Sequence, residues 1–188
     1  MQRKTFKDMQ CPIARSLERV GEWWSILILR EALYGSTRFD DFQRNLDIAP
    51  NMLTRRLAGL VEAGLLERRQ YSARPPRFEY VLTERGHDFQ PVLLALLAWG
   101  NRHFAPEGAS VQLVDKASGR PVEPRLVDAA SGEPIGFARH ALVPGPAASE
   151  GMRRRLAAAA SHLAAQASEG AAPAAQGEAA PVMEASGS

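Results

Sequence analysis

The stretch of sequence that decides the fold is IAPNMLTRRLAGLVEAGLLERRQYSARPPRFEYVLT, residues 48–83. Its first part predicts a helix over Asn51–Ala63, because four apolar residues recur at the i, i+4, i+7, i+8 spacing of one helical face: Leu53, Leu57, Leu60 and Val61. Pro50 suits the first helical position, where its missing N–H costs no hydrogen bond. Gly64 is expected to end this helix.

The period of the sequence changes after Gly64. Residues 65–71 and 78–83 are short and rich in residues that strands favour, which predicts a β-hairpin. Between them lies SARPPR, residues 72–77. Two prolines and two arginines at a hairpin tip predict a solvent-exposed arm rather than a tight turn.

Three helices are predicted upstream of this stretch. The first starts after Cys11, ends at Gly21 and carries a short apolar stripe: Ile13, Leu17 and Val20. The second, over Trp23–Tyr34, is apolar almost all round, so we expect it to be central and buried. The third follows Thr37, a predicted N-cap with Asp40 as the capping-box partner, and it places three apolar residues on one face: Phe39, Phe42 and Leu46.

Downstream of the hairpin, Thr83 is a second predicted N-cap and residues 84–104 have helical periodicity. Pro91 is expected either to bend this helix or to mark its first turn. One face carries a large apolar stripe: Phe89, Leu93, Leu96, Leu97 and Phe104. Because the preceding helices already supply a core, this stripe predicts a dimerisation surface. The alternative is that the helix packs back on its own domain.

The order of these elements predicts a mainly α fold with a small β wing, the winged helix-turn-helix. A helix fits the major groove of DNA, and a preceding helix braces it. The exposed side of the helix over Asn51–Ala63 carries residue types that contact DNA: Asn51, Thr54, Arg55 and Arg56. Arg74 and Arg77 lie on the predicted wing. The alternatives are an ordinary solvated helix face, and a winged-helix module that binds proteins without reading DNA sequence.

Residues 11–100 resemble the HxlR family of bacterial and archaeal winged-helix transcriptional regulators. Four collinear stretches carry the resemblance: CPIARSLERVGEWWSILILREALYG, TRFDDFQRNL, IAPNMLTRRLAGLVEAGLLERR and YSARPPRFEYVLTERG, which start at residues 11, 37, 48 and 71. The resemblance implies a homodimer, formed by the first helix and the long helix after the wing, that binds a palindromic operator as a regulator, expected to be a repressor.

The resemblance also implies which residues touch double-stranded DNA. It places base and phosphate contacts on the four residues named above, from Asn51 to Arg56, and wing contacts on Arg74 and Arg77. Arg38, at the start of the bracing helix, is a further candidate for a phosphate contact. Ala49 departs from the family, in which Ser or a similar cap is commoner before the proline. Its lack of a capping side chain is expected to weaken the helix start by about 1 kcal/mol.

Cys11 is the only cysteine of the chain, which excludes an intrachain disulfide and a cysteine-based zinc site. It directly precedes Pro12 at a predicted helix N-terminus, where the helix dipole favours a thiolate. Some members of the resembling family use a cysteine here to sense oxidants or electrophiles. Cys11 is therefore a candidate thiol switch; the alternative is a small residue that fits the turn. Trp23, Trp24 and Phe6 are candidates for an apolar effector pocket nearby, or for core residues.

Charge and composition divide the 188 residues into three predicted segments. Residues 1–104 hold 16 Lys+Arg and 12 Asp+Glu, a net charge of +4, and we assign them to DNA binding and dimerisation. Residues 105–145, the extension, are expected to be β-rich. Residues 146–188 are rich in alanine: residues 152–166 are expected to form an exposed helix, and those from Gly170 onward to be disordered.

The extension contains an internal repeat. VDKASGRPV, from Val114, recurs thirteen residues later as VDAASGEPI, from Val127. Each copy predicts strand, turn, strand, similar to a knuckle of a zinc ribbon, but the ligand positions hold poor zinc ligands: Asp115, Ser118, Asp128 and Ser131. The sequence therefore predicts a degenerate knuckle pair without metal; a plain hairpin duplication is the alternative.

No catalytic or cofactor motif is present: there is no nucleophile elbow, phosphate-binding loop or dinucleotide fingerprint. We therefore expect neither enzymatic activity nor a cofactor or metal. The longest apolar run has eight residues, 92–99, while a membrane span needs about 20. These observations predict a cytoplasmic protein without a membrane partner, whose effector is a small molecule or electrophile.

Overall fold

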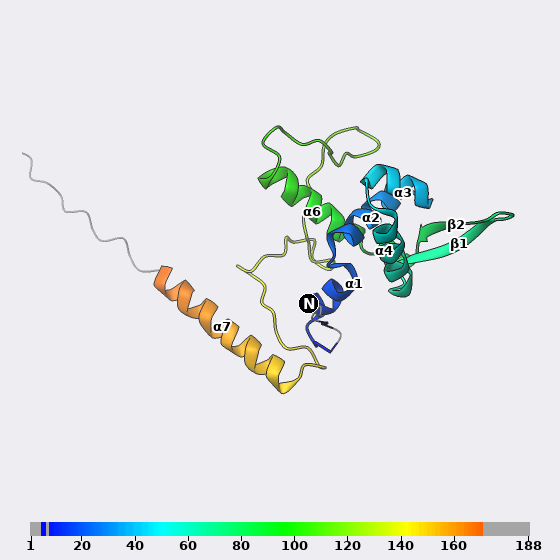
Figure 1. The fold of residues 1–188 in the computed structure, drawn as a ribbon. Helices are drawn as coiled ribbons and strands as arrows, with labels where there is room; N and C mark the ends of the chain where they lie inside the picture. Colours follow the sequence, from blue (N-terminus) through cyan, green and yellow to red (C-terminus); the bar gives the residue numbers. More distant parts are fainter. Residues whose placement is uncertain (1–4, 7, 171–188) are drawn as a thin grey trace, which may run out of the picture. The chain divides into compact units, whose positions relative to one another are not determined.

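The computed structural model describes residues 5–6 and 8–170. Two units are distinct: residues 1–140 and residues 141–188. The first unit contains six helices and one hairpin in its described part (Figure 1): α1 Pro12–Val20, α2 Trp23–Leu33, α3 Phe39–Leu46, α4 Pro50–Glu62, β1 Leu66–Ala73, β2 Pro76–Leu82, α5 Glu84–His87 and α6 Gln90–His103. The second unit contains α7, Glu150–Gly170.

Helix α2 is the centre of the first unit, with α3, α4, α6 and the base of the hairpin packed around it (Figure 1). Seven large side chains are fully buried: Ile28, Leu29, Phe42, Leu53, Leu57, Leu60 and Leu66. The apolar stripe predicted for α4 is thus the stripe that the core buries, and α2 is central as predicted. The exposed large apolar residues of α2 lie at its two ends, Trp23 and the C-cap residue Tyr34.

The start of α3 differs from the prediction. Arg38, not Thr37, is the N-cap residue, and no side chain caps the helix. The backbone of Thr37 instead accepts a 2.7 Å hydrogen bond from the N–H of Tyr80, and Arg38 forms a β-bridge with Glu79. This segment is therefore paired with β2 of the wing through a single β-bridge, and this long-range pairing prevails over local capping.

The hairpin is longer and tighter than predicted. β1 and β2 pair antiparallel from Leu66 opposite Leu82 to Ala73 opposite Pro76, with an irregularity between Gln70 and Ser72. The connection is the two-residue turn Arg74-Pro75, so the expectation of an arm rather than a tight turn was wrong, whereas the predicted solvent exposure of the tip is confirmed. Pro76 is accommodated because a proline can occupy the first position of a strand.

Thr83 joins the hairpin to the following helices and caps α5 as predicted. Its hydroxyl accepts a 3.1 Å hydrogen bond from the N–H of Gly86 and donates a 2.7 Å bond to the carbonyl of Gly64. The predicted helix over 84–104 is divided into α5 and α6. Pro91 lies in the first turn of α6, so it marks a helix start rather than a bend.

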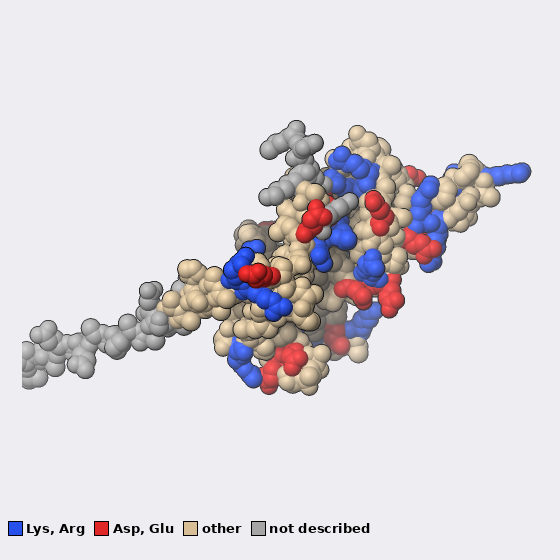
Figure 2. Space-filling model, turned by 90° about the horizontal axis from the view of Figure 1, so that it is seen from below, with Lys and Arg blue, Asp and Glu red and all other residues tan. Residues whose placement is uncertain are grey.

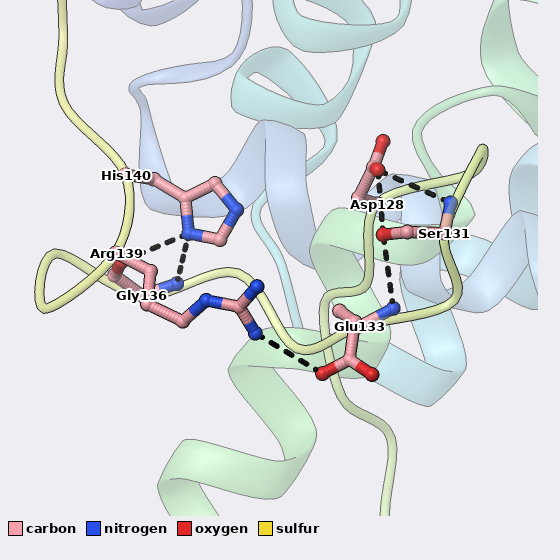
Figure 3. A network of polar contacts seen from close by, with 6 residues as sticks. All are labelled: Asp128, Ser131, Glu133, Gly136, Arg139 and His140. Carbon is pink, nitrogen blue, oxygen red and sulfur yellow. Dashed lines mark hydrogen bonds and ion pairs between the residues drawn. The ribbon is translucent and has the colours of Figure 1, made fainter.

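The repeat in the extension forms two similar turns, each closed by a single β-bridge: Val114 with Pro121, and Val127 with Pro134. Gly119 and Gly132 have φ of +69° and +72°, a conformation that glycine adopts without strain. Figure 3 shows the second turn, where the Asp128 carboxylate accepts a 2.7 Å hydrogen bond from the Ser131 hydroxyl.

The first turn repeats this contact between Asp115 and Ser118, also at 2.7 Å. In both turns the serine lowers the pKa of the aspartate carboxyl, because its hydrogen bond stabilises the charged form. The two predicted ligand positions of each turn thus bind one another. Within residues 5–6 and 8–170, no three His, Cys, Asp or Glu side chains gather to hold a metal.

The second unit is described by its helix. α7 covers the helix predicted for residues 152–166 and extends it at both ends. The predicted disorder from Gly170 onward falls almost entirely on residues 171–188, which lie outside the described residues. In the described part of the chain, no helix has the length and apolar character that crossing a bilayer requires.

Candidate nucleic-acid interface

The N-terminal turns of α4 present an exposed polar face. Asn51, Thr54 and Arg55 are all exposed, followed by the small residues Ala58 and Gly59. The Asn51 side-chain oxygen accepts a 2.7 Å bond from the N–H of Met52, and the Thr54 hydroxyl donates a 2.8 Å bond to the Pro50 carbonyl. These local bonds hold both side chains at the helix start. The face is therefore exposed and polar, and the small side chains of Ala58 and Gly59 leave room for another molecule to approach closely.

Arg56 lies differently from the other predicted contact residues. Its guanidinium forms a 2.7 Å ion pair with Glu22, and only 13% of its side chain is exposed. Glu22 is the N-cap residue of α2, so the ion pair links α4 to the central helix. The structure does not bring Arg56 to the exposed face. The sequence could not show this, because Glu22 lies 34 residues earlier in the chain.

The wing carries its charge at the tip and along β1. Arg74 and Arg77 are exposed at the turn, and Figure 2 shows basic side chains along the projecting wing and at its end. Two further arginines lie on β1: Arg68 stacks 3.4 Å from the centroid of the Phe78 ring, and Arg69 pairs with Glu67 at 2.8 Å. Neither arginine was predicted as a DNA contact, although both lie in a predicted strand of the wing.

Arg38 lies where α3 meets the wing. Its guanidinium is 5.0 Å from the centroid of the Tyr71 ring, a cation–π contact with the half of β1 nearer the tip of the wing. The side chain remains exposed. The structure therefore brings Arg38 next to the wing rather than leaving it isolated at a helix end.

The predicted dimerisation stripe of α6 divides into two parts. Phe89 and Leu93 pack against the protein's own core, as the alternative reading of this helix required. Leu96 and Phe104 are exposed, and Leu97 is half-buried.

Two exposed apolar residues of α6 were missed by the sequence stripe: Val92 and Trp99, the latter 55% exposed. The rings of Trp99 and Phe104 make an edge contact at 4.8 Å. The exposed apolar line of α6 is thus Val92, Leu96, Trp99 and Phe104, and the name "α6 line" refers to these four residues below.

The other side of α6 is occupied by the extension. Asn101 donates a 2.9 Å hydrogen bond to the Val111 carbonyl, and Arg102 pairs with Glu123. These contacts explain why the α6 line is rotated from the predicted stripe: the extension covers part of the helix that periodicity alone treats as free.

Helix α1 also exposes apolar side chains. Ile13 is 70% exposed and Leu17 is exposed as well, so only Val20 of the predicted stripe enters the core. Cys11 precedes α1 as its N-cap residue, is half-buried and forms no disulfide. Of the proposed effector-pocket residues, Phe6 and Trp24 are half-buried, whereas Trp23 is largely exposed.

Comparison with known proteins agrees with this arrangement. A sequence model of the family described as "HxlR-like helix-turn-helix" matches residues 19–108. The HTH-type transcriptional regulator Rv3095 of Mycobacterium tuberculosis, described as uncharacterised, is 40% identical over 146 residues, which are 77% of this chain and 90% of that protein. The regulator YdeP of Bacillus subtilis is 34% identical over 94 residues, or 50% of this chain and 73% of YdeP.

Two solved structures are similar over about three quarters of the chain. PA1374 of Pseudomonas aeruginosa, described as a candidate transcription factor, is 63% identical with a TM-score of 0.58, covering 78% of this chain and all of that one. PA1607, described in the same way, is 35% identical with a TM-score of 0.68, covering 76% of this chain and all of that one.

Fold and relatives together define a DNA-binding transcriptional regulator of the winged helix-turn-helix class. The chain belongs to the HxlR-like helix-turn-helix family.

Proposed function

We propose that the protein acts as a homodimeric repressor on a palindromic operator. One observation carries the proposal: the exposed start of α4, with Asn51, Thr54 and Arg55, lies in the same unit as an exposed wing tipped by Arg74 and Arg77. The first group has the donors and acceptors that read base edges, and the second has the cations that bind phosphate.

In this proposal the contact residues divide into those that read bases and those that bind the phosphate backbone. Arg55 reads a guanine in the major groove, Asn51 reads an adenine, and Thr54 contacts phosphate or a thymine methyl. Arg74, Arg77 and Arg38 contact the phosphate backbone, with Arg68 and Arg69 adding charge along the wing. The buried pair with Glu22 supports a positioning task for Arg56, which orients α4 rather than touching DNA.

Dimerisation is supported by two exposed apolar surfaces in the first unit. The α6 line joins Trp99 and Phe104 in one cluster, and α1 exposes Ile13 and Leu17. Groups of exposed apolar side chains, unlike single scattered ones, are typical of protein–protein contacts. A two-fold axis through these helices would present two copies of α4 to a palindromic site.

Control by an effector completes the proposal. Cys11 is half-buried at the start of α1, so modification of its thiol would add bulk where α1 begins and disturb the exposed face of that helix. In a gel-shift assay with quinone, aldehyde or peroxide, we expect the wild type to release its operator and Cys11→Ser to stay bound. Equal release by both proteins would exclude Cys11 as the switch.

Footprinting on the DNA that flanks the protein's own gene tests the central proposal. We expect a protected palindrome that overlaps a promoter. Arg55→Ala should lose about 1–3 kcal/mol at the preferred sequence and discriminate less between sequences. Arg74→Ala should weaken binding to all sequences and lower the salt slope by about one counterion.

Arg125→Ala is the matched control, because Arg125 is an exposed arginine of the same unit that lies on the extension. It should leave both the affinity and the sequence preference unchanged. If neither Arg55→Ala nor Arg74→Ala alters DNA binding, the alternative of a protein-interaction module replaces the proposal.

A further inference from the structure

A cavity of about 500 Å³ lies between α2, α6 and residues 111–113 of the extension, all within the first unit. Its wall is mainly leucine, with Leu33 from α2, Leu94 from α6 and Leu113 from the extension among the lining residues. Sites for small molecules have volumes of about 300–1,000 Å³ and mostly apolar walls. We propose that this cavity binds a neutral, largely apolar small molecule that serves as the effector of the regulator, an inference that rests on the proposed function.

The cavity offers hydrogen bonds as well as apolar surface. Gln90 and Gln112 line it from α6 and from the extension. Neither side-chain amide makes a hydrogen bond to another residue of the described chain. Each amide can donate and accept, so the two are suited to a hydroxyl, carbonyl or ether group on an otherwise apolar ring system.

The electrostatics of the cavity favour a neutral ligand. Arg30 is the charged residue of the wall, and its Nε and Nη2 atoms both donate to one carboxylate oxygen of Glu31, at 3.1 and 2.8 Å. Glu31 is buried, with 7% of its surface exposed. Because the buried Glu31 carboxylate already compensates the charge of Arg30, the wall offers an anionic ligand no unpaired positive charge. A neutral ligand leaves the pair intact.

The same ion pair connects the cavity to the DNA-facing side of the unit. The second carboxylate oxygen of Glu31 accepts a 3.2 Å hydrogen bond from the side-chain amide of Asn45, on α3. Helix α3 packs on α4 and starts at Arg38, beside the wing. A ligand that packs against Arg30 therefore contacts one end of a network that runs through the buried Glu31 to Asn45 on α3, which is a physical route for coupling the two sites.

The extension gives this cavity its third wall, and it is held there by the Asn101 bond to Val111 and by the ion pair of Arg102 with Glu123. Cys11 does not line the cavity. The proposed ligand site and the candidate thiol switch are thus separate places on the molecule, and they can be tested separately.

The test uses the full chain without DNA and a neutral fluorescent probe, N-phenyl-1-naphthylamine. We expect saturable fluorescence enhancement with one site per chain. Leu113→Trp fills the cavity from the extension and should weaken probe binding at least about tenfold. Val127→Trp, on an exposed residue of the extension outside the cavity, is the matched control and should bind the probe like the wild type.

A sulfonated probe of the same ring system, 8-anilino-1-naphthalenesulfonate, tests the charge argument and should bind at least about tenfold more weakly. Tighter binding of the sulfonate overturns the choice of a neutral ligand. Gln112→Trp is a second filling variant at an exposed position, and circular dichroism of both variants confirms that they are folded. Probe binding unchanged in both folded variants overturns the site.

Two further outcomes separate this inference from the proposed function. If the probe does not bind and Leu113→Trp shifts the monomer–dimer equilibrium, a second copy of the chain fills the cavity and the ligand assignment is wrong. If the probe binds in the cavity but leaves operator affinity unchanged, the effector role is overturned. Loss of operator binding by the unliganded protein contradicts the proposed function instead, because probe binding is measured without DNA.

Discussion

Arg55 and Arg56 are neighbours in α4 and have the same chemistry, yet they meet different surroundings. Arg55 is exposed, with one guanidinium nitrogen 3.3 Å from the Met52 sulfur, whereas Arg56 is tied to Glu22 and largely buried. A rotation of about 100° per residue is enough to turn one side chain outward and the next inward. The role of each arginine is thus decided by the side of α4 on which it lies and by whether another helix packs against that side.

Arg56→Ala should lower the free energy of unfolding by about 1–3 kcal/mol, because it removes the 2.7 Å ion pair between the largely buried Arg56 side chain and the partly buried Glu22 carboxylate. Arg55→Ala is the matched control, and as a surface substitution it should change stability by less than about 0.5 kcal/mol. Urea denaturation followed by circular dichroism measures both. Equal stability of the two variants would contradict the positioning task of Arg56.

The Asp128 carboxyl should titrate below its ordinary pKa of 3.8, because the Ser131 hydroxyl and the backbone N–H groups of the turn stabilise its charged form. A lowered pKa in the folded state gives a stabilising contribution that is present above 3.8 and is lost as the pH falls through the lower value. The second turn of the extension should therefore loosen only in acid.

NMR titration of the Ser131 and Gly132 amide signals measures this midpoint. Ser131→Ala should raise it toward 3.8, since the serine side chain is the largest cause of the shift. The matched turn of Asp115 and Ser118 is an internal control, and its midpoint should remain low in the same variant. A midpoint for Asp128 that does not respond to Ser131→Ala would show that the hydroxyl contributes little.

At the scale of elements, α6 shows how much periodicity can predict. Its apolar character and its C-terminal end could be predicted, but the side left exposed could not, because the extension binds the helix through Asn101 and Arg102. The same limit applies to Thr37, whose backbone carbonyl accepts a hydrogen bond from the N–H of Tyr80 on the wing. Residues 48–66 were predicted closely, since their leucine spacing and Pro50 are local signals.

The candidate DNA-contact site follows the same rule. Asn51, Thr54 and Arg55 could be chosen from the sequence because their exposure depends only on the phase of one helix. Arg56 could not be separated from them, because its partner comes from the start of α2. The sequence thus predicts sites within one element better than sites that depend on contacts between elements.

Trp99→Glu tests the α6 line as a dimer interface. Trp99 is exposed and contacts Phe104, and a carboxylate there would be desolvated on association without a partner. We expect the dimer dissociation constant to rise at least about 30-fold, the effect of losing about 2 kcal/mol at an interface hot spot. Sedimentation equilibrium measures the change.

Leu126→Glu is the control, because Leu126 is an even more exposed apolar residue on the extension. It should leave the dissociation constant unchanged. Leu93→Ala gives a contrasting result: Leu93 packs on the core of its own chain, so the variant should lose stability rather than association. A monomeric wild-type protein, or equal effects of Trp99→Glu and Leu126→Glu, would place the interface elsewhere.

The whole molecule has a formal charge of +2, a value that hides an uneven distribution. Residues 1–104 carry +4, and a dimer doubles this figure. Residues 141–188 hold three arginines and four glutamates, a net of −1. Helix α4, the wing and the candidate effector cavity all belong to residues 1–140. Within the described residues, the second unit therefore contributes neither to the buried core nor to the proposed DNA contacts.

A chain that ends at His140 should keep both its fold and its operator affinity. The described buried core lies between Val20 and Leu66, so the melting transition of the first unit should not change. Because the removed segment carries little net charge, the slope of log affinity against log salt should shift by less than about one counterion. Fluorescence anisotropy with labelled operator at several salt concentrations measures the affinity and the slope together. The full chain with Arg153, Arg154 and Arg155 replaced by alanine is the matched control. A lower slope in both proteins, by about one to three counterions, would show that the start of α7 contacts phosphate and that the DNA-binding surface includes the second unit.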